Sequence, residues 1–299
     1  MLGFIIFLSS LFPSFIAVSA ESRAYMDKVL LQARDGARAE LLTHGAHLCS
    51  WIPASGAEQL FLSKTSEFGP GKAIRGGVPI VFPQFSNHGT LPKHGFARNA
   101  EWRLVSSGVL EQGAAQAVFE LQENIARLLI WPHVFRAELV VTVAEETLQL
   151  DFSVVNNGDT EFSFTTALHT YFRVDDIAQT VIHGLGGLDY RDTVDGQRDC
   201  HQVEELLQIT AETDRIYGNV ASDILIIQPH QQLQIRQSGF ADAVVWNPGA
   251  AKGAQLADLE PNGYQRMLCV EAATILKPVV LAPGQIWTGM QIMSVQSRS

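Results

Sequence analysis

The chain has 299 residues, of which 46% are hydrophobic and 17% charged, with 24 glycines, 12 prolines and 3 cysteines. This composition excludes a disordered chain, a collagen-like repeat and a scaffold built on several disulfides. Lys and Arg number 21 against 31 Asp and Glu, so the formal net charge at pH 7 is −10, which argues against nucleic acid as a partner. A small anionic ligand is compatible with this charge, because a few converging cations can bind it locally.

Residues 1–20 form an apolar segment without charged side chains that ends in Val18-Ser19-Ala20. An apolar run before small residues is typical of a cleaved secretory signal. The segment lacks a basic start and is interrupted by Pro13, so no stable membrane insertion is expected. The alternatives are an accessory segment or an over-extended start, with Met26 as a second start. We therefore predict a signal-like segment over 1–20 and a single domain over 21–299.

Strand patterns dominate the rest of the chain. Phe135–Val143 and Leu148–Val154 alternate apolar and polar residues, which predicts two half-buried strands joined by a turn at Glu145-Glu146. A turn at 156–159 precedes a further alternating stretch, Glu161–Phe164, so an antiparallel meander is expected. Shorter runs predict strands at 29–32, 117–121, 223–227, 232–235, 243–246 and 267–270.

Helical spacing is scarce. The best candidate for an amphipathic helix is the short region Glu204–Ala211. No linker or fixed-period repeat divides the chain. We therefore predict an all-β protein built as one large β-sandwich, since such sandwiches can exceed 200 residues.

Two cationic stretches are candidate anion sites. Arg75 precedes the pair Gly76-Gly77, and glycine permits close backbone approach to a ligand while arginine offers a planar fork of donors. The alternative is a surface arginine beside a turn. Lys93, His94 and Arg98 lie within six positions between turn residues, which predicts an anion clamp or, alternatively, a solvated loop.

A histidine and a carboxylate stand out because they lie in apolar stretches. His169 lies in Ala167–Phe172, where it is either a hydrogen-bonded core residue or a proton donor with a partner. Glu271 follows an apolar run, where a carboxylate is costly unless it is paired or functional. A salt bridge at a strand edge is the alternative for Glu271. Asp214, before Arg-Ile-Tyr217, is of a type that lines sugar pockets.

Several motifs for other chemistries are absent from the sequence. No metal site is predicted, because His44 and His47 lack nearby partner ligands and no Cys pair or His-Glu-x-x-His appears. The phosphate-binding P-loop, Gly-x-Gly-x-x-Gly and Gly-x-Ser-x-Gly are also missing. Cys49, Cys200 and Cys269 are scattered and predict buried free thiols in a reducing compartment.

Taken together, ordered blocks of sequence resemble the glucose-6-phosphate 1-epimerase branch of the aldose 1-epimerase family. The blocks are Ile74–Pro83, Leu91–Arg98, Leu168–Phe172, Asp214–Tyr217, Val245–Pro248 and Cys269–Ala272. The resemblance implies a galactose-mutarotase-like β-supersandwich, no cofactor, and interconversion of the α and β anomers of a hexose 6-phosphate, most simply glucose 6-phosphate.

The same resemblance assigns roles to individual residues. Glu271 matches the family's catalytic base and His169 its catalytic acid, with the roles reversed on ring closure. The substrate-binding positions follow in turn: Arg75 and Arg98 match the phosphate side, Asp214 a sugar-hydroxyl position, Lys93 a variable contact position, and His94 a second pocket histidine.

Two alternatives to this function stay open at this point. An unphosphorylated aldose is the rival substrate, which the pair Arg75 and Arg98 argues against. A non-catalytic sugar-phosphate binding protein is the rival class, which the presence of both His169 and Glu271 argues against. The substrate favours the cytoplasm, whereas cleavage of 1–20 as a signal would place the protein outside it. The sequence does not predict the oligomeric state.

Overall fold

A computed structural model describes residues 27–69, 71–194 and 196–298. Its regular structure is almost entirely β-strand, as the alternating patterns predicted. The predicted signal-like segment 1–20 lies outside the described residues. Among the helices that are described, none is both long and apolar enough to cross a membrane.

The strands form three sheets. A three-stranded sheet contains β1 (Lys28–Gln32), β2 (Arg38–Leu42) and β3 (His47–Ile52). A nine-stranded sheet has the order β14 (Leu206–Gln208), β11 (Val181–His183), β16 (Ile224–Ile227), β17 (Gln231–Ser238), β20 (Ile286–Ser297), β8 (Thr147–Asn156), β7 (Phe135–Ala144), β6 (Ala115–Gln122) and β5 (Arg103–Val109).

The eight-stranded sheet carries the residues of interest for function. Its order is β13 (Arg198–His201), β12 (Asp189–Asp192), β15 (Thr213–Tyr217), β18 (Asp242–Asn247), β19 (Met267–Leu281), β9 (Phe162–Leu168) and β4 (Ile80–Val81), with β10 (Tyr171–Arg173) paired to β19. The helices are short: α1 (Ile125–Ile130), α2 (Gly249–Gly253), and 3-10 turns at Ala97–Asn99, Ile177–Gln179 and Gly263–Arg266.

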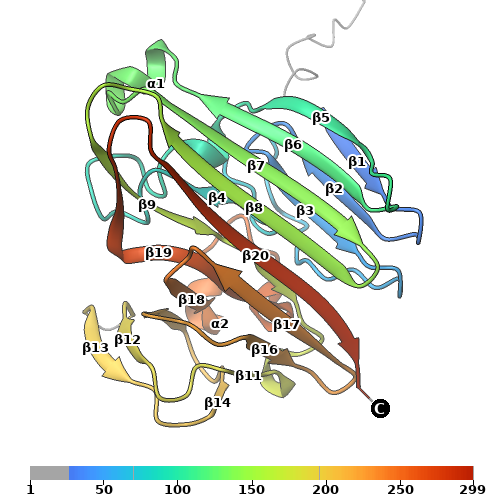
Figure 1. The fold of residues 1–299 in the computed structure, drawn as a ribbon. Helices are drawn as coiled ribbons and strands as arrows, with labels where there is room; N and C mark the ends of the chain where they lie inside the picture. Colours follow the sequence, from blue (N-terminus) through green and yellow to red (C-terminus); the bar gives the residue numbers. More distant parts are fainter. Residues whose placement is uncertain (1–26, 70, 195, 299) are drawn as a thin grey trace, which may run out of the picture.

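The period-two alternation of β7 and β8 is reproduced in their burial. Every second side chain of both strands is buried, and the two strands pair antiparallel along their whole length around Glu145-Glu146. Figure 1 shows β5, β6, β7, β8 and β20 side by side as one long layer. The strand and turn predictions for 135–154 are confirmed.

Two predictions about local structure are wrong. The stretch Glu161–Phe164 does begin a strand, β9, but β9 does not continue the meander: β8 pairs with β20, and β9 crosses to the other sheet between β19 and β4. Alternation defines a strand but not its partner. The region Glu204–Ala211 contains strand β14, which pairs with β11, rather than a helix. Only Leu207 of β14 is buried. Three residues are too few to distinguish the two-residue period of a strand from the longer period of a helix.

One cluster of buried apolar side chains joins the three sheets. It includes Leu41 of β2, Phe152 of β8 and Ala272 of β19. A second cluster, which includes Tyr171, Trp246 and Cys269, lies in the eight-stranded sheet around β18 and β19. These cores fix β15 and β19, which carry Asp214 and Glu271, and the end of β9, which His169 follows. The single domain over 21–299 stays a prediction.

Candidate active site

One cavity of about 340 Å³ brings together side chains from distant segments. Six of the residues singled out in the sequence line it: Arg75, Lys93, His94, Arg98, His169 and Asp214. Glu271 lies directly against His169. The volume is at the lower end of the range for small-molecule sites, as suits a ligand the size of one sugar.

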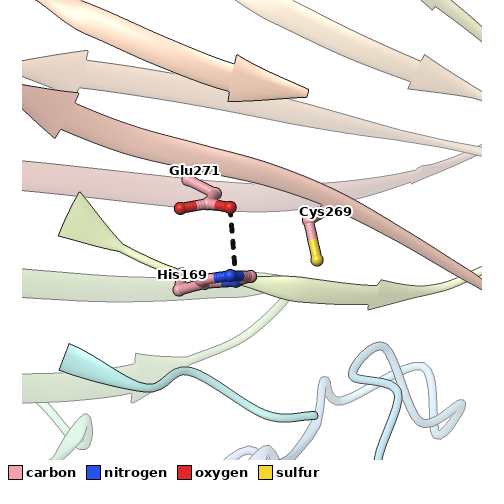
Figure 2. Close-up of side chains that lie close together, drawn as sticks. All are labelled: His169, Cys269 and Glu271. Carbon is pink, nitrogen blue, oxygen red and sulfur yellow. Dashed lines mark ion pairs between the residues drawn. The ribbon is translucent and has the colours of Figure 1, made fainter. Parts of the chain in front are cut away.

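The pairing of β9 with β19 places His169 beside Glu271. Leu168, the last residue of β9, lies opposite Ala272 of β19. His169 follows Leu168 and therefore lies opposite Glu271, the residue before Ala272. His169 Nδ1 and Glu271 Oε1 are 3.3 Å apart, and the dashed line in Figure 2 marks this pair. The backbone N–H of His169 donates to the Pro79 carbonyl at 3.0 Å, which holds the residue after the strand has ended.

Aromatic rings fix the orientation of the His169 imidazole. The Tyr171 ring stacks on it with centroids 4.8 Å apart and an interplanar angle of 8°. Trp246 contacts it edge-on at 6.0 Å, and the His94 ring lies 5.6 Å away. The imidazole is therefore held in one plane beside the carboxylate.

Arg75 is held by two side chains at the edge of the same cavity. Its Nη1 donates to Tyr171 Oη and its Nη2 to Asp258 Oδ2, both at 3.0 Å. Burial lowers the pKa of Arg75, but Tyr171 and Asp258 raise it overall, so the guanidinium is charged. Tyr171 thus contacts both Arg75 and His169.

Arg98 and Lys93 add positive charge on the side of His94. Arg98 Nη2 donates to the Lys93 carbonyl at 2.9 Å, while Arg98 Nε is buried without a partner among the described residues. The Ser86 N–H donates to His94 Nδ1 at 3.3 Å. Burial, with the charges of Arg98 and Lys93, lowers the pKa of His94 to about 3. His94 is therefore neutral and carries its proton on Nε2.

The glycines beside Arg75 have a structural role that differs from the expected one. A Cβ on Gly76 would collide with the Phe61 carbonyl, and one on Gly77 with the Leu48 carbonyl. Both residues have positive φ, at 123° and 60°. The close approach that requires glycine here is therefore to neighbouring backbone and not to a ligand.

Burial pushes the pKa values of the central pair in opposite directions. Glu271 is 1% exposed, and burial followed by the nearby Asp214 raises its pKa well above 4.5. Burial, followed by His94, Arg75 and Arg98, lowers the pKa of His169 well below 6.5. The proton affinities of a carboxylate and an imidazole, which differ in water, are thereby brought toward each other.

The raised pKa of Glu271 predicts a stability gain on its replacement. Below pH 4.5 the carboxyl is protonated in both the folded and the unfolded chain, so Glu271→Gln has little effect there. As the pH rises above 4.5, the unfolded parent chain releases this proton while the folded parent retains it. The free energy of unfolding of the parent therefore falls with rising pH. Glutamine does not titrate, so the variant does not lose this contribution. We expect Glu271→Gln to raise Tm at pH 8 by roughly 2 °C or more, the shift that 1 kcal/mol produces at this size.

Calorimetry of both proteins between pH 4 and pH 8 measures this effect. Glu161→Gln, at an exposed carboxylate, is the matched control and should leave Tm unchanged. A Tm difference between Glu271→Gln and the parent that shrinks with rising pH would contradict a raised Glu271 pKa.

Asp214 and Lys252 form the polar wall of the cavity with Lys93. Burial raises the pKa of Asp214, while a hydrogen bond with Thr193 and the charges of Lys252 and Lys93 lower it in part. Lys252 Nζ is 2.7 Å from Glu212 Oε1. The wall therefore offers both acceptors and donors to a polyhydroxylated ligand.

Sequence reasoning missed three residues of this site. Tyr171 follows His169 by two positions, and the period-two rule could have found it, since such side chains share a face of an extended segment. Asp258, which holds Arg75, and Lys252 lie in segments with no motif, so nothing in the sequence pointed to them.

Comparisons with known proteins identify a matching family model and related chains. The family model described as aldose 1-epimerase matches residues 27–294. A protein of Cenchrus ciliaris named "Putative glucose-6-phosphate 1-epimerase" is 35% identical over 291 residues, with 94% of this chain and 88% of that protein covered. A protein of the same name from Escherichia coli K12 is 36% identical over 241 residues, with 79% of each covered.

The crystal structure of a "putative mutarotase (YeaD)" from Salmonella typhimurium superposes with a TM-score of 0.85 at 30% identity over 92% of each chain. Together with the sheets described above, this likeness confirms the predicted galactose-mutarotase-like β-supersandwich. The chain belongs to the aldose 1-epimerase family.

Proposed function

We propose that this chain is an epimerase that interconverts the α and β anomers of a hexose 6-phosphate, with glucose 6-phosphate as its preferred substrate. One observation carries the proposal: a buried His169–Glu271 pair, 3.3 Å apart, adjoins a cavity lined by Arg75, Lys93 and Arg98. The pair suits proton transfer at the anomeric centre, and the cations suit a phosphate dianion. The names of the two relatives described above agree with this substrate.

The proposed reaction needs one base and one acid. Glu271 removes the proton of the C1 hydroxyl while His169 protonates the ring oxygen, the C1–O5 bond breaks, and an open-chain aldehyde forms. Rotation about C1–C2 presents the other face of the aldehyde, and closure returns each proton with the roles of the two residues reversed. Such acid–base assistance is typically worth about 10²–10⁴-fold in rate.

The opposed pKa shifts suit a reaction in which the two residues exchange roles. Burial raises the Glu271 pKa and lowers that of His169, so the preference of a proton for imidazole over carboxylate, which holds in water, is weakened. A large difference between the pKa values of the two residues would favour ring opening over ring closure, or the reverse. The pair therefore needs one proton in total, and the pH dependence belongs to the pair as a unit.

The other cavity residues would bind and orient the sugar phosphate. Arg75 and Arg98 offer forked donors to the phosphate, and Arg75 is already oriented by Asp258 and Tyr171. The neutral His94 can donate from Nε2 to a sugar oxygen. Asp214 can accept from sugar hydroxyls, and Lys93 can donate to them.

An anomer-exchange assay by NMR tests the function. We expect enzyme-catalysed exchange, above the uncatalysed rate, for glucose 6-phosphate and slower exchange for galactose 6-phosphate, glucose and galactose. Equal exchange of glucose and glucose 6-phosphate would assign the enzyme to unphosphorylated aldoses. Binding of glucose 6-phosphate without exchange would make the chain a binding protein.

Arg98→Ala tests the phosphate side of the cavity. The Arg98 side chain makes one hydrogen bond within the described residues, to the Lys93 carbonyl, so its loss disturbs the protein less than loss of Arg75. A hydrogen bond to a charged group is worth about 1.5–3 kcal/mol, so KM for glucose 6-phosphate should rise by about 10- to 100-fold. KM for glucose should change little, because glucose has no phosphate.

The control for this variant is Arg103→Ala, at an exposed arginine on β5 that pairs with Glu120. It should leave both KM values unchanged. If Arg98→Ala raised KM equally for glucose and glucose 6-phosphate, Arg98 would not bind the phosphate.

We also propose that the protein works in the cytoplasm, where sugar phosphates are held by their charge. The proposal depends on the substrate and not on the fold. N-terminal sequencing of the native protein tests it: a mature chain that begins near Glu21 would show that the segment 1–20 is removed and would contradict a cytoplasmic site of action.

A further inference from the structure

A third side chain, that of Cys269, lies beside the His169–Glu271 pair. Cys269 precedes Glu271 by two positions on β19, so both side chains project from the same face of the strand. One donor atom from each of the three residues lies within 4.8 Å of the other two, and Figure 2 shows Cys269 to one side of the His169–Glu271 pair. No local sequence motif marks this group, because its residues come from β19 and from the end of β9, which are remote in sequence.

Two atoms of the group are buried without a hydrogen-bond partner. His169 Nδ1 lies near Glu271 Oε1 but not in hydrogen-bond geometry, and Glu271 Oε2 has no partner among the described residues. His169 and Glu271 are 8% and 1% exposed. An unsatisfied buried polar group costs about 1–3 kcal/mol, so a ligand that both atoms can bind is favoured.

We propose that His169, Cys269 and Glu271 form a binding site for a thiophilic divalent cation such as Zn²⁺, and that the bound cation blocks the acid–base pair. The blocking effect rests on the proposed function, whereas the metal site itself does not. This proposal departs from the sequence-based prediction of no metal site, which depended on motifs local in sequence.

The donor set and spacing fit zinc. Zinc binds sulfur at about 2.3 Å and nitrogen or oxygen at about 2.0–2.2 Å in tetrahedral geometry, so its ligands lie about 3.3–3.6 Å from one another. The His169–Glu271 pair is already 3.3 Å apart, and the Cys269 thiol needs to approach by about 1 Å, within reach of a side-chain rotation. A thiol among the ligands selects zinc over Mg²⁺, which prefers oxygen.

The surroundings favour a reversible inhibitory ion. Three protein ligands leave a fourth position, which can face the cavity that His169 lines. Arg75 and Arg98 lie close enough to His169 to lower its pKa, and their charges also oppose a cation. On binding, the Cys269 thiol releases its proton to the buffer and contributes a thiolate. The His169–Glu271 pair also releases the one proton that it holds, so that neutral His169 and ionised Glu271 coordinate the ion.

Titration of the purified protein with Co²⁺ alone tests the site without reference to activity. A thiolate ligand gives Co²⁺ a sulfur-to-cobalt charge-transfer band in the near ultraviolet, and Zn²⁺ should displace it. We expect a saturable band with one equivalent in the parent and its loss in Cys269→Ser. Cys200→Ser, at a partly exposed thiol on β13, is the matched control and should keep the band.

Inhibition of anomer exchange is the second readout. Zn²⁺ should inhibit the parent, Mg²⁺ should not, and EDTA should restore activity. Cys269→Ala should keep the basal rate, since Cys269 takes no part in the proposed reaction, and its Zn²⁺ inhibition constant should rise at least about tenfold, which is about 1.4 kcal/mol. Circular dichroism checks that the variants fold, and anomalous diffraction from a Zn²⁺-soaked crystal of the parent should place the ion among the three side chains.

The outcomes separate the two proposals. A Co²⁺ band in a protein that shows no anomer exchange would leave the metal site standing and remove the proposed function. A band that survives in Cys269→Ser, a band lost in Cys200→Ser, or an anomalous peak elsewhere would overturn the metal site. The metal site would also fail if neither Co²⁺ nor Zn²⁺ bound the parent.

Discussion

Glu271→Gln is expected to reduce enzyme-catalysed anomer exchange of glucose 6-phosphate by about 10²–10⁴-fold, the full range of acid–base assistance. Glutamine keeps the size and one oxygen of the side chain but cannot accept the C1 proton. Exchange NMR after subtraction of the uncatalysed rate measures the loss. Calorimetric titration with glucose 6-phosphate should show binding within a few-fold of the parent, because the cations that line the cavity and would bind the phosphate are intact.

This variant also separates catalysis from stability. We expect the same substitution to remove activity and to raise Tm at pH 8, since the buried carboxylate that performs the chemistry is costly to keep ionised. Glu161→Gln controls for the loss of a negative charge. Exchange near the parent rate in Glu271→Gln would remove Glu271 as the base, whatever its effect on Tm.

His169→Asn is expected to cause a loss of similar size, again about 10²–10⁴-fold in exchange rate. Asparagine retains a polar group near the position of Nδ1, but it cannot deliver a proton to the ring oxygen. Binding of glucose 6-phosphate should persist, because Arg75 is still held by Tyr171 and Asp258. His201→Asn, at an exposed histidine paired with Asp189, is the control and should exchange at the parent rate.

The double variant tests whether the two residues act as a unit. If Glu271 and His169 transfer protons in one concerted cycle, removal of both should cost little more than removal of either. A double variant whose loss equals the product of the two single losses would indicate that they act in independent steps.

The sequence determined the secondary structure where its patterns were long. The alternation over Phe135–Val143 and Leu148–Val154 predicted β7, β8 and their turn, because a strand half buried in a sheet must alternate apolar and polar side chains. It also pointed to Arg75, Lys93, His94, Arg98, His169, Asp214 and Glu271 by residue type and by resemblance to a family. It could not assign β9 to its sheet or recognise the short strand β14, because neither is decided by local periodicity.

The tertiary structure decided which of these residues meet. The register of β9 on β19 places His169 against Glu271, and the fold brings Tyr171 of β10 and Asp258 of the loop after α2 to Arg75. It also shows that Gly76 and Gly77 are needed for close packing against neighbouring backbone and not, as expected, for contact with a ligand. The type of a residue determines which chemistry its side chain can perform. Its burial and its distance to a partner determine its pKa and metal affinity, and both arise only when strands remote in sequence pair. The net negative charge of the chain argued against a polyanionic partner, and only the fold brought four cationic side chains together around one cavity.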